Sequence, residues 1–301
     1  MKAARIHQRD GEGLVYEDAP APVHVTGDVV VEVRAASFVP DELNWPGTWV
    51  DRAGKDRTPS IPAHEVAGVV SEVHYGTTGF AVGDRVFGLT DWHRDGAAAE
   101  FVAVEARNLA LLPAALDFTS AAALPLAGLT AWQGLFVHGG LQAGQRVVIH
   151  GAGGGTGLLA VQLAHDAGAH VIATGRAKAA TIANESGACR FVDLEHDRLE
   201  DIEDVDLVFD TIGGDILARS AGLLRPGGAL VSITAPPPVA PADGRTAFFI
   251  VEPNHEQLVE LAQRAEAGRI RPHVGAVFPL ADAARAFATK RGTLGKVVLQ
   301  P

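Results

Sequence analysis

The chain has 301 residues, 47% of them hydrophobic and 20% charged, which excludes a disordered or collagen-like protein. Its 25 lysines and arginines against 36 aspartates and glutamates give a formal charge of −11, which opposes a nucleic-acid or anionic membrane partner. Cys189 is the single cysteine, so an internal disulfide and a four-cysteine zinc lobe are both excluded. This length suits two packed domains, each with its own core.

Residues 1–13 contain no apolar core of signal-peptide length. No window of the chain reaches the roughly 20 apolar residues that a membrane span needs. We therefore expect a cytoplasmic protein without a membrane partner.

The first third of the chain is predicted to be an irregular β region. Short runs rich in β-branched residues, separated by turn residues, occupy residues 29–38, 65–73, 84–89 and 99–106. From Asp117 the composition changes to a long alanine- and leucine-rich stretch, which predicts a helix that continues through Pro125. The predicted first domain is therefore residues 1–117.

The middle of the chain alternates apolar strands with helical segments from Arg146 to about Gly268. This rhythm is typical of a doubly wound α/β domain with a parallel sheet, predicted over residues 118–269. It includes a strand at 247–252 and a helix with Asn254 at its start. The tail is more β-like, so residues 270–301 are expected to complete the first domain.

The sharpest motif is the stretch 146–164, RVVIHGAGGGTGLLAVQLA, where a hydrophobic strand runs through glycines into an amphipathic helix. Glycines allow the backbone to approach a pyrophosphate closely, and the helix N-terminus favours its negative charge. The pattern is A-x-G-x-x-G on Ala152, Gly154 and Gly157. An ordinary tight turn would also fit, but the strand–turn–helix setting favours a dinucleotide site.

The end of the next strand reads ATGRAK, without the acid that usually accepts hydrogen bonds from the ribose of NAD. Gly175 leaves space there, and Arg176, with Lys178 nearby, offers positive charge to a 2′-phosphate. These charges could also be solvated loop residues. The missing acid favours NADP(H) as the cofactor.

Collinear blocks run through nearly the entire chain, among them PSIPAHEVAGVVSEV, AAALPLAGLTAWQGL, HGAGGGTG, DLVFDTIGG, LLRPGGALVSI and GKVVL. Their order resembles the medium-chain dehydrogenase/reductase superfamily, specifically its zinc-free quinone oxidoreductase-like branch. The resemblance implies an α/β protein with a GroES-like β domain built from both chain ends. It also implies a Rossmann domain between them, with cofactor and substrate in the intervening cleft.

The same resemblance implies cofactor contacts at matching positions. These are Thr130, Gly154, Gly155, Thr156, Gly157, Thr174, Arg176, Thr211, Ile212, Gly213, Ile233, Thr234, Phe249, Ile250, Val251, Leu294, Gly295 and Lys296. The last three would close over the nicotinamide or a phosphate. The apolar members could instead be core residues whose backbone groups alone serve the cofactor.

The fragment AHEVAG places His64 and Glu65 where zinc-dependent alcohol dehydrogenases of the superfamily carry a zinc-binding histidine. A catalytic zinc needs three protein ligands, yet the slots for cysteine in those relatives fall on Val39 and Leu126. We therefore expect no metal. His64 is then either a hydrogen-bonded structural group or a catalytic donor of a hydrogen bond or proton to a substrate carbonyl.

Tryptophans are concentrated near the expected substrate side. The resemblance places the loop 43–60, which contains Trp45 and Trp49, beside the substrate pocket. Trp92, which follows the strand 84–89, and Val39 are the other candidates for this pocket. The indole rings could stack on a quinone or conjugated ketone, or they could simply pack the loop.

The predicted function is NADPH-dependent reduction of quinones or α,β-unsaturated carbonyl compounds without zinc. One alternative is an alcohol dehydrogenase whose zinc takes a missing ligand from Asp41, Glu42 or Glu65. Another is a regulatory protein that binds NADPH without turnover. We also expect a homodimer that pairs through the strand at 247–252, because burial in a dimer would cover an apolar edge strand.

Overall fold

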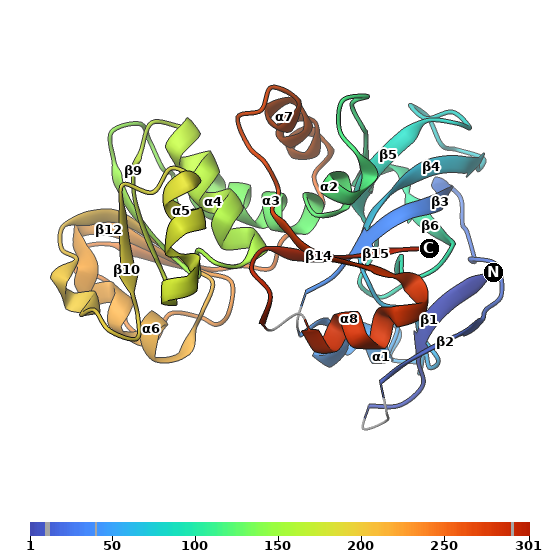
Figure 1. Cartoon of the computed structure of the whole chain (residues 1–301), viewed down its shortest axis with the longest axis horizontal. Coiled ribbons are helices and arrows are strands. Elements are labelled where there is room, and N and C mark those ends of the chain that lie inside the picture. The colour runs from blue at the N-terminus through green and yellow to red at the C-terminus, as the bar shows by residue number, and fades with distance from the viewer. Residues whose placement is uncertain (10–12, 40, 290–291) are drawn as a thin grey trace. The chain divides into compact units, whose positions relative to one another are not determined.

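The computed structural model describes residues 1–9, 13–39, 41–289 and 292–301 (Figure 1). They form two units. Unit 1 comprises Met1–Leu126, Pro253–Glu266 and Pro272–Pro301, and unit 2 comprises Ala127–Glu252 and Ala267–Arg271. Compared with the predicted division, unit 1 also takes in residues 118–126 and 253–266. The domain bounds read from the sequence remain a prediction.

Unit 1 is built on β-structure. Its strands are β1 (Lys2–Ile6), β2 (Leu14–Asp18), β3 (Asp28–Ser37), β4 (Glu65–Val73), β5 (Arg85–Leu89), β6 (Phe101–Glu105), β7 (Leu109–Leu111), β14 (Val274–Pro279) and β15 (Lys296–Gln300). The larger sheet has the order β14-β15-β3-β4-β5-β7, with β6 also paired to β3, while β1 and β2 form a separate antiparallel pair. Valines of β3 and β4 supply much of the buried core, as expected for β-branched residues on a sheet.

Helices of unit 1 are short. They are α1 (Pro46–Trp49), α2 (Phe118–Ala122), α7 (His255–Glu266) and α8 (Ala283–Thr289), with 3₁₀ turns at Glu42–Asn44, Ala106–Asn108 and Leu280–Asp282. The side chain of Asn254 accepts a hydrogen bond from the Gln257 N–H at 3.0 Å, which confirms the predicted N-terminal cap of α7.

Unit 2 is a parallel sheet with crossover helices. Its strands are β8 (Arg146–His150), β9 (His170–Gly175), β10 (Arg190–Asp193), β11 (Val205–Asp210), β12 (Leu224–Ser232) and β13 (Arg245–Phe248), and its helices are α4 (Gly155–Asp166), α5 (Ala180–Glu185) and α6 (Gly214–Arg219). Short 3₁₀ turns lie at Ala177–Ala179, Leu199–Asp201 and Ser220–Leu223. The strand order is β10-β9-β8-β11-β12-β13, that of a doubly wound dinucleotide-binding fold. The direction of winding changes between β8 and β11, so the carboxyl ends of these strands are where such a fold binds its ligand.

The predicted continuous helix after Asp117 is wrong in one respect. The structure has two helices, because α2 ends at Ala122 and α3 (Pro125–Trp132) begins at the proline and continues as a π-helical segment to His138. Proline lacks an N–H and is accommodated at the first position of a helix. The chain passes from unit 1 to unit 2 within α3.

The predicted strand 247–252 is displaced. Strand β13 ends at Phe248, and beyond it the side chain of Gln133 donates to the Glu252 carbonyl at 2.8 Å and accepts from the Glu252 N–H at 3.1 Å. A side-chain amide thus replaces a strand partner there. Across the described ranges, no helix is long and apolar enough to cross a membrane.

Candidate functional site

The turn from β8 into α4 has the geometry of a phosphate-binding loop. Gly151 has a φ of +84°, and Gly154 caps α4, which begins at Gly155. A Cβ on Gly157 would lie 2.2 Å from the Gly151 carbonyl oxygen, so glycine is required for this close approach. The predicted residues Gly154, Gly155, Thr156 and Gly157 all fall at the start of this 12-residue helix, and the turn therefore fits a pyrophosphate.

A second cluster surrounds Asp210 at the end of β11. Its buried carboxylate accepts hydrogen bonds from Ile212 N–H at 3.1 Å, from Gly213 N–H at 3.0 Å and from Thr234 Oγ at 3.1 Å. Thr211 donates to the His150 carbonyl at 2.7 Å. The predicted residues 211–213 and Thr234 are thus brought together at the carboxyl ends of β8, β11 and β12. Asp210 itself was missed, although an acid that ends a buried apolar strand is a readable signal.

His150 ends β8 and is fully buried. Its Nδ1 lies 2.8 Å from Thr174 Oγ1, and its Nε2 lies 3.0 Å from Ser220 Oγ. Burial lowers the pKa of His150 to about 4, so the ring is neutral at physiological pH. The hydroxyl of Thr174, itself a predicted cofactor contact, is turned toward this ring and buried.

The carbonyl of Thr174 also supports the phosphate turn, because it accepts hydrogen bonds from Gly151 N–H and Ala152 N–H, both at 3.0 Å. Arg176 follows Gly175 at the end of β9. Its side chain is 68% exposed, and its Nε lies 3.6 Å from Glu195 Oε1. The guanidinium therefore remains accessible to a phosphate.

The remaining predicted contacts of unit 2 lie in different surroundings. Thr130 is buried in α3. Ile233 follows β12, where its N–H donates to the Asp210 carbonyl at 3.2 Å. Phe249 and Val251 are buried, whereas Ile250 is 72% exposed. The ring of Phe249 stacks on His138 with centroids 4.4 Å apart.

In unit 1, His64 immediately precedes β4 and is paired with Glu42. The distance from His64 Nδ1 to Glu42 Oε1 is 2.6 Å, and both side chains are almost completely buried. The same carboxylate oxygen accepts the Ala63 N–H at 2.5 Å. His64 Nε2 lies 3.4 Å from the Arg94 carbonyl oxygen, so the two ring nitrogens have different partners. From the sequence, Glu42 was expected only as a substitute zinc ligand, and its pairing with His64 was not predicted.

Two of the predicted tryptophans cover this pair. The rings of Trp45 and Trp92 pack edge to face at 5.2 Å, and their centroids lie 6.5 and 5.4 Å from that of His64. Val39 donates its N–H to Glu42 Oε2 at 3.4 Å. Trp49 is placed elsewhere, in the core of unit 1, with its Nε1–H donating to the Leu43 carbonyl at 2.8 Å.

Lys296, at the start of β15, is buried in an ion pair with Glu65. Its ammonium also donates to the Phe38 carbonyl at 3.1 Å, and Leu126 N–H donates to Glu65 Oε1 at 2.9 Å. Burial raises the pKa of the Glu65 carboxyl, and Lys296 opposes that rise. A cofactor contact from the Lys296 side chain would require this pair to break. Leu294 and Gly295 precede it, the latter with a φ of +72°.

The donor set around His64 does not fit a catalytic zinc. Val39 and Leu126 have no coordinating side-chain atoms, and Glu65 is engaged by Lys296. Among the residues that the structure describes, the groups of three His, Cys, Asp or Glu side chains close enough to share an ion do not include His64. His64 and Glu42 alone are one ligand short of a catalytic site.

Two families match stretches of the chain. Residues 25–114 match the family described as Alcohol dehydrogenase GroES-like domain, and residues 186–299 match the family described as Zinc-binding dehydrogenase.

Similar proteins cover nearly the whole chain. The 2-methylene-furan-3-one reductase of Solanum lycopersicum is 35% identical over 292 residues, covering 91% of this chain and 71% of that protein. The chloroplastic NADPH-dependent alkenal/one oxidoreductase of Arabidopsis thaliana is 34% identical over 288 residues, covering 91% and 72%. Among solved structures, the quinone oxidoreductase from Coxiella burnetii has a TM-score of 0.91 at 27% identity, covering 100% of this chain and 99% of that one. The similarity therefore extends over both units.

Proposed function

Because the chain belongs to the medium-chain dehydrogenase/reductase superfamily, in its quinone oxidoreductase-like branch, we propose that it reduces quinones or α,β-unsaturated carbonyl compounds with NADPH and without zinc. Membership of this branch makes the chain an oxidoreductase. The substrate class, the choice of NADPH and the independence from zinc are the proposal, together with a cytoplasmic location.

The buried Glu42–His64 pair beneath Trp45 and Trp92 is the observation that carries the proposal. It occupies the position where a metal-dependent relative needs a ligand set, and it offers a proton-handling group instead. A conjugated acceptor needs no Lewis acid to accept a hydride, unlike the reverse oxidation of a simple alcohol. NADPH, when bound, supplies that hydride.

The residues of unit 2 would hold the cofactor. The glycine turn at 151–157 binds the pyrophosphate at the start of α4. Asp210 orients Gly213 and Thr234 at the neighbouring strand ends. Arg176 takes the 2′-phosphate through charge-assisted hydrogen bonds.

In unit 1, Glu42 accepts a hydrogen bond from His64 Nδ1–H and so fixes the orientation of the ring, which leaves Nε2 as the nitrogen that exchanges a proton with the substrate. When His64 carries a proton on both ring nitrogens, it donates the Nε2 proton to the substrate oxygen and becomes neutral with its remaining proton on Nδ1. Trp45 and Trp92 exclude water and stack on the flat acceptor. Reduction consumes one proton from solution, which re-enters through this imidazole.

The deciding experiment follows nicotinamide absorbance while NADPH is offered with quinones and enones, and NADP⁺ with simple alcohols, all in the presence of a chelator. We expect NADPH oxidation with quinones or enones. Turnover that stops with chelator and returns with zinc would instead support the zinc-assisted alcohol dehydrogenase. Tight NADPH binding without turnover across the panel would support the regulatory protein.

A pair of variants tests the role of His64. We expect His64→Ala to lower kcat about 10²-fold while NADPH affinity stays unchanged, because the cofactor-binding turn lies in unit 2. The matched control is His170→Ala, which removes an exposed histidine at the start of β9 and should leave kcat unchanged. Unchanged kcat and an unchanged pH profile in His64→Ala would remove this residue from the mechanism.

Arg176 tests the cofactor preference. We expect Arg176→Ala to lower kcat/KM for NADPH about tenfold, since one charge-assisted contact at an exposed site is lost. The kcat/KM for NADH should stay nearly unchanged. Glu195→Gln removes the acidic neighbour of Arg176 and should shift the preference slightly toward NADPH. Equal losses with both cofactors in Arg176→Ala would contradict recognition of the 2′-phosphate.

We also propose a homodimer through the edge of the sheet in unit 2. Strand β13 is the last strand of the order, and Phe248 and Ile250 are 42% and 72% exposed. Ile250→Asp is expected to yield monomer in sedimentation equilibrium, because it places a charge in the interface. It is preferable to Phe249→Asp, which would also disrupt packing against His138. A dimer that persists in Ile250→Asp would reject this interface.

A further inference from the structure

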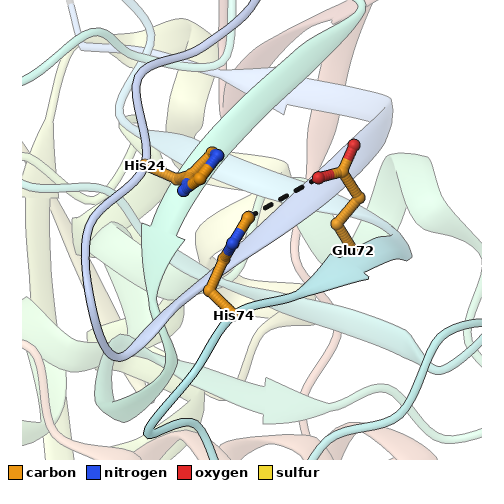
Figure 2. Close-up of side chains that lie close together, drawn as sticks. All are labelled: His24, Glu72 and His74. Carbon is orange, nitrogen blue, oxygen red and sulfur yellow. Dashed lines mark ion pairs between the residues drawn. The ribbon is translucent and has the colours of Figure 1, made fainter.

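Two imidazoles and a carboxylate meet on unit 1, away from the Glu42–His64 pair. His24 lies in the segment before β3, Glu72 lies in β4, and His74 follows that strand. Figure 2 shows the side chains of Glu72 and His74 pointing toward one another, and the His24 ring is stacked on that of His74 with centroids 3.3 Å apart. One nitrogen or oxygen atom from each of the three residues lies within 4.8 Å of the others.

The backbone holds these residues in place. Glu72 and His74 are two positions apart, so they project from the same side at the end of β4. The turn after His24 is joined to this strand end, because Gly27 N–H donates to the Tyr75 carbonyl at 3.1 Å and His74 N–H donates to the Asp28 carbonyl at 3.2 Å. The rings of His24 and His74 are also in contact, with planes 15° apart. Imidazole binds a metal in the plane of its ring, so the exposed His24 ring has to turn for both histidines to coordinate one ion.

The ring of His74 has an unsatisfied polar atom. Its Nε2 is buried and has no hydrogen-bond partner within the described part of the chain. The nearest carboxylate oxygen, Glu72 Oε2, lies 3.6 Å away, which is too long for a hydrogen bond. Buried polar atoms in folded proteins are nearly always satisfied, so this nitrogen, on the side of the ring that faces Glu72, is available to a further partner.

We propose that His24, Glu72 and His74 bind a zinc ion that ties the segment before β3 to the end of β4. Zinc takes imidazole nitrogen and carboxylate oxygen at about 2.0–2.2 Å in tetrahedral geometry. Two ligands of such a tetrahedron are about 3.4 Å apart, close to the 3.6 Å between His74 Nε2 and Glu72 Oε2. Calcium and magnesium prefer oxygen ligands, so a pair of imidazoles selects against them. A water molecule completes the coordination.

Neighbouring charges leave the site open to a cation. The guanidinium of Arg94, which binds the segment around His24, is paired with Asp28 at 2.6 Å and also donates to the Val23 carbonyl at 3.1 Å. Asp28 is in turn occupied by Arg94 and by the Val25 N–H at 2.8 Å, so it is not a further ligand. Glu72, 62% exposed, supplies the negative charge.

A second cluster, Asp193, Glu195 and His196, provides an internal comparison. It has a single imidazole, whose Nδ1 is 2.7 Å from Asp193, and this hydrogen bond raises the pKa of His196. A bound proton competes with a metal for imidazole. We therefore expect zinc to prefer the cluster with two histidines.

The test is a titration of metal-stripped full-length protein with zinc chloride, followed by calorimetry and by the melting temperature. The wild type should bind one zinc per chain and melt at a higher temperature with zinc. His24→Ala and His74→Ala should each weaken binding at least about tenfold, whereas His196→Ala and His64→Ala should bind as the wild type does. Cobalt chloride should give the visible bands of tetrahedral Co²⁺ in the wild type and not in His24→Ala.

Three results would overturn the site: no zinc binding by the wild type, binding unaffected by both His24→Ala and His74→Ala, or binding abolished by His196→Ala or His64→Ala. If His74→Ala fails to fold, the exposed His24 still carries the test, since its removal leaves β4 intact. Zinc bound here is independent of the proposed reductase activity, which should persist in metal-stripped protein.

Discussion

The two units bury polar groups in different ways. Unit 1 buries acidic side chains beside basic ones, Glu65 beside Lys296 and Glu42 beside His64. Unit 2 buries His150 among hydroxyl groups and surrounds Asp210 with N–H and O–H donors. In unit 1, each of these buried acids is matched by a basic side chain. In unit 2, the buried side chains are matched by neutral hydrogen-bonding groups placed at strand ends.

The Glu65–Lys296 pair and the Asp210 cluster also differ in how far apart their members lie along the chain. Lys296 and Glu65 are 231 residues apart, and they meet because β15 pairs with β3, which pairs with β4. The donors around Asp210 all lie within 24 residues of it along the chain. The Asp210 cluster is therefore a local consequence of parallel strands ending at one edge, whereas the Glu65–Lys296 pair is a consequence of tertiary closure.

The largest effect is expected from Lys296→Met. It leaves the Glu65 carboxylate buried without its counter-charge, which typically costs about 3–5 kcal/mol. The free energy of unfolding in urea measures the loss. Tryptophan fluorescence is a suitable probe, because Trp45, Trp49 and Trp92 belong to unit 1.

The double variant Glu65→Gln/Lys296→Met is the matched control for this pair. It removes both charges, so most of the loss should be recovered. Wild-type stability in Lys296→Met, or a double variant no more stable than the single one, would show that unit 1 does not depend on the pairing of this charge.

His150 should make the protein sensitive to acid. Its pKa is about 4 in the folded protein against 6.5 for the free group, so between these values the unfolded chain binds more protons. Stability is therefore lost as pH falls from about 6.5 toward 4, by up to about 3 kcal/mol. His150→Asn keeps a polar side chain and removes the titration. Free energies of unfolding measured against pH should fall more steeply in the wild type than in this variant, and parallel curves would contradict the assignment.

The site in unit 2 could largely be predicted from sequence because its signals are local. A strand, a glycine turn and a helix follow one another within residues 146–164, and the carboxyl ends of parallel strands meet at one edge. Thr174 shows the limit. The family resemblance assigns it to the cofactor, whereas the structure shows its hydroxyl bonded to His150.

In unit 1, the strands could be predicted from the sequence, but the pairing of the side chains at the candidate site could not. The strands at β3, β4, β5 and β6 follow from β-branched runs, whereas partner choice depends on the register of strands far apart in the chain. Lys296 was therefore assigned to the cofactor, and its pairing with Glu65 was not anticipated. Trp49 was grouped with Trp45 and Trp92 by proximity in sequence, although it packs in the core.

The smallest of these effects is expected from Glu42→Gln, which weakens the pair in unit 1 without deleting either partner. The amide keeps the size of the carboxylate, but an N–H₂ group replaces one of the two oxygens. The side chain therefore cannot accept from Val39 N–H as well as from Ala63 N–H and His64. We expect kcat to fall about tenfold, which corresponds to about 1.4 kcal/mol. The pH dependence of kcat should change, while KM for the acceptor stays nearly constant. The control is Glu256→Gln, at an exposed position in the first turn of α7.

The double variant His64→Ala/Glu42→Gln distinguishes positioning from an independent role for Glu42. If Glu42 acts only by orienting His64, its replacement should have no further effect once the imidazole is gone, so the double variant should match His64→Ala in kcat. A second tenfold loss in the double variant would mean that Glu42 contributes separately, through its contacts with the N–H groups of Ala63 and Val39. That outcome would make the carboxylate of unit 1 comparable to Asp210 in unit 2, an acid that organises backbone donors rather than a partner for a single charge.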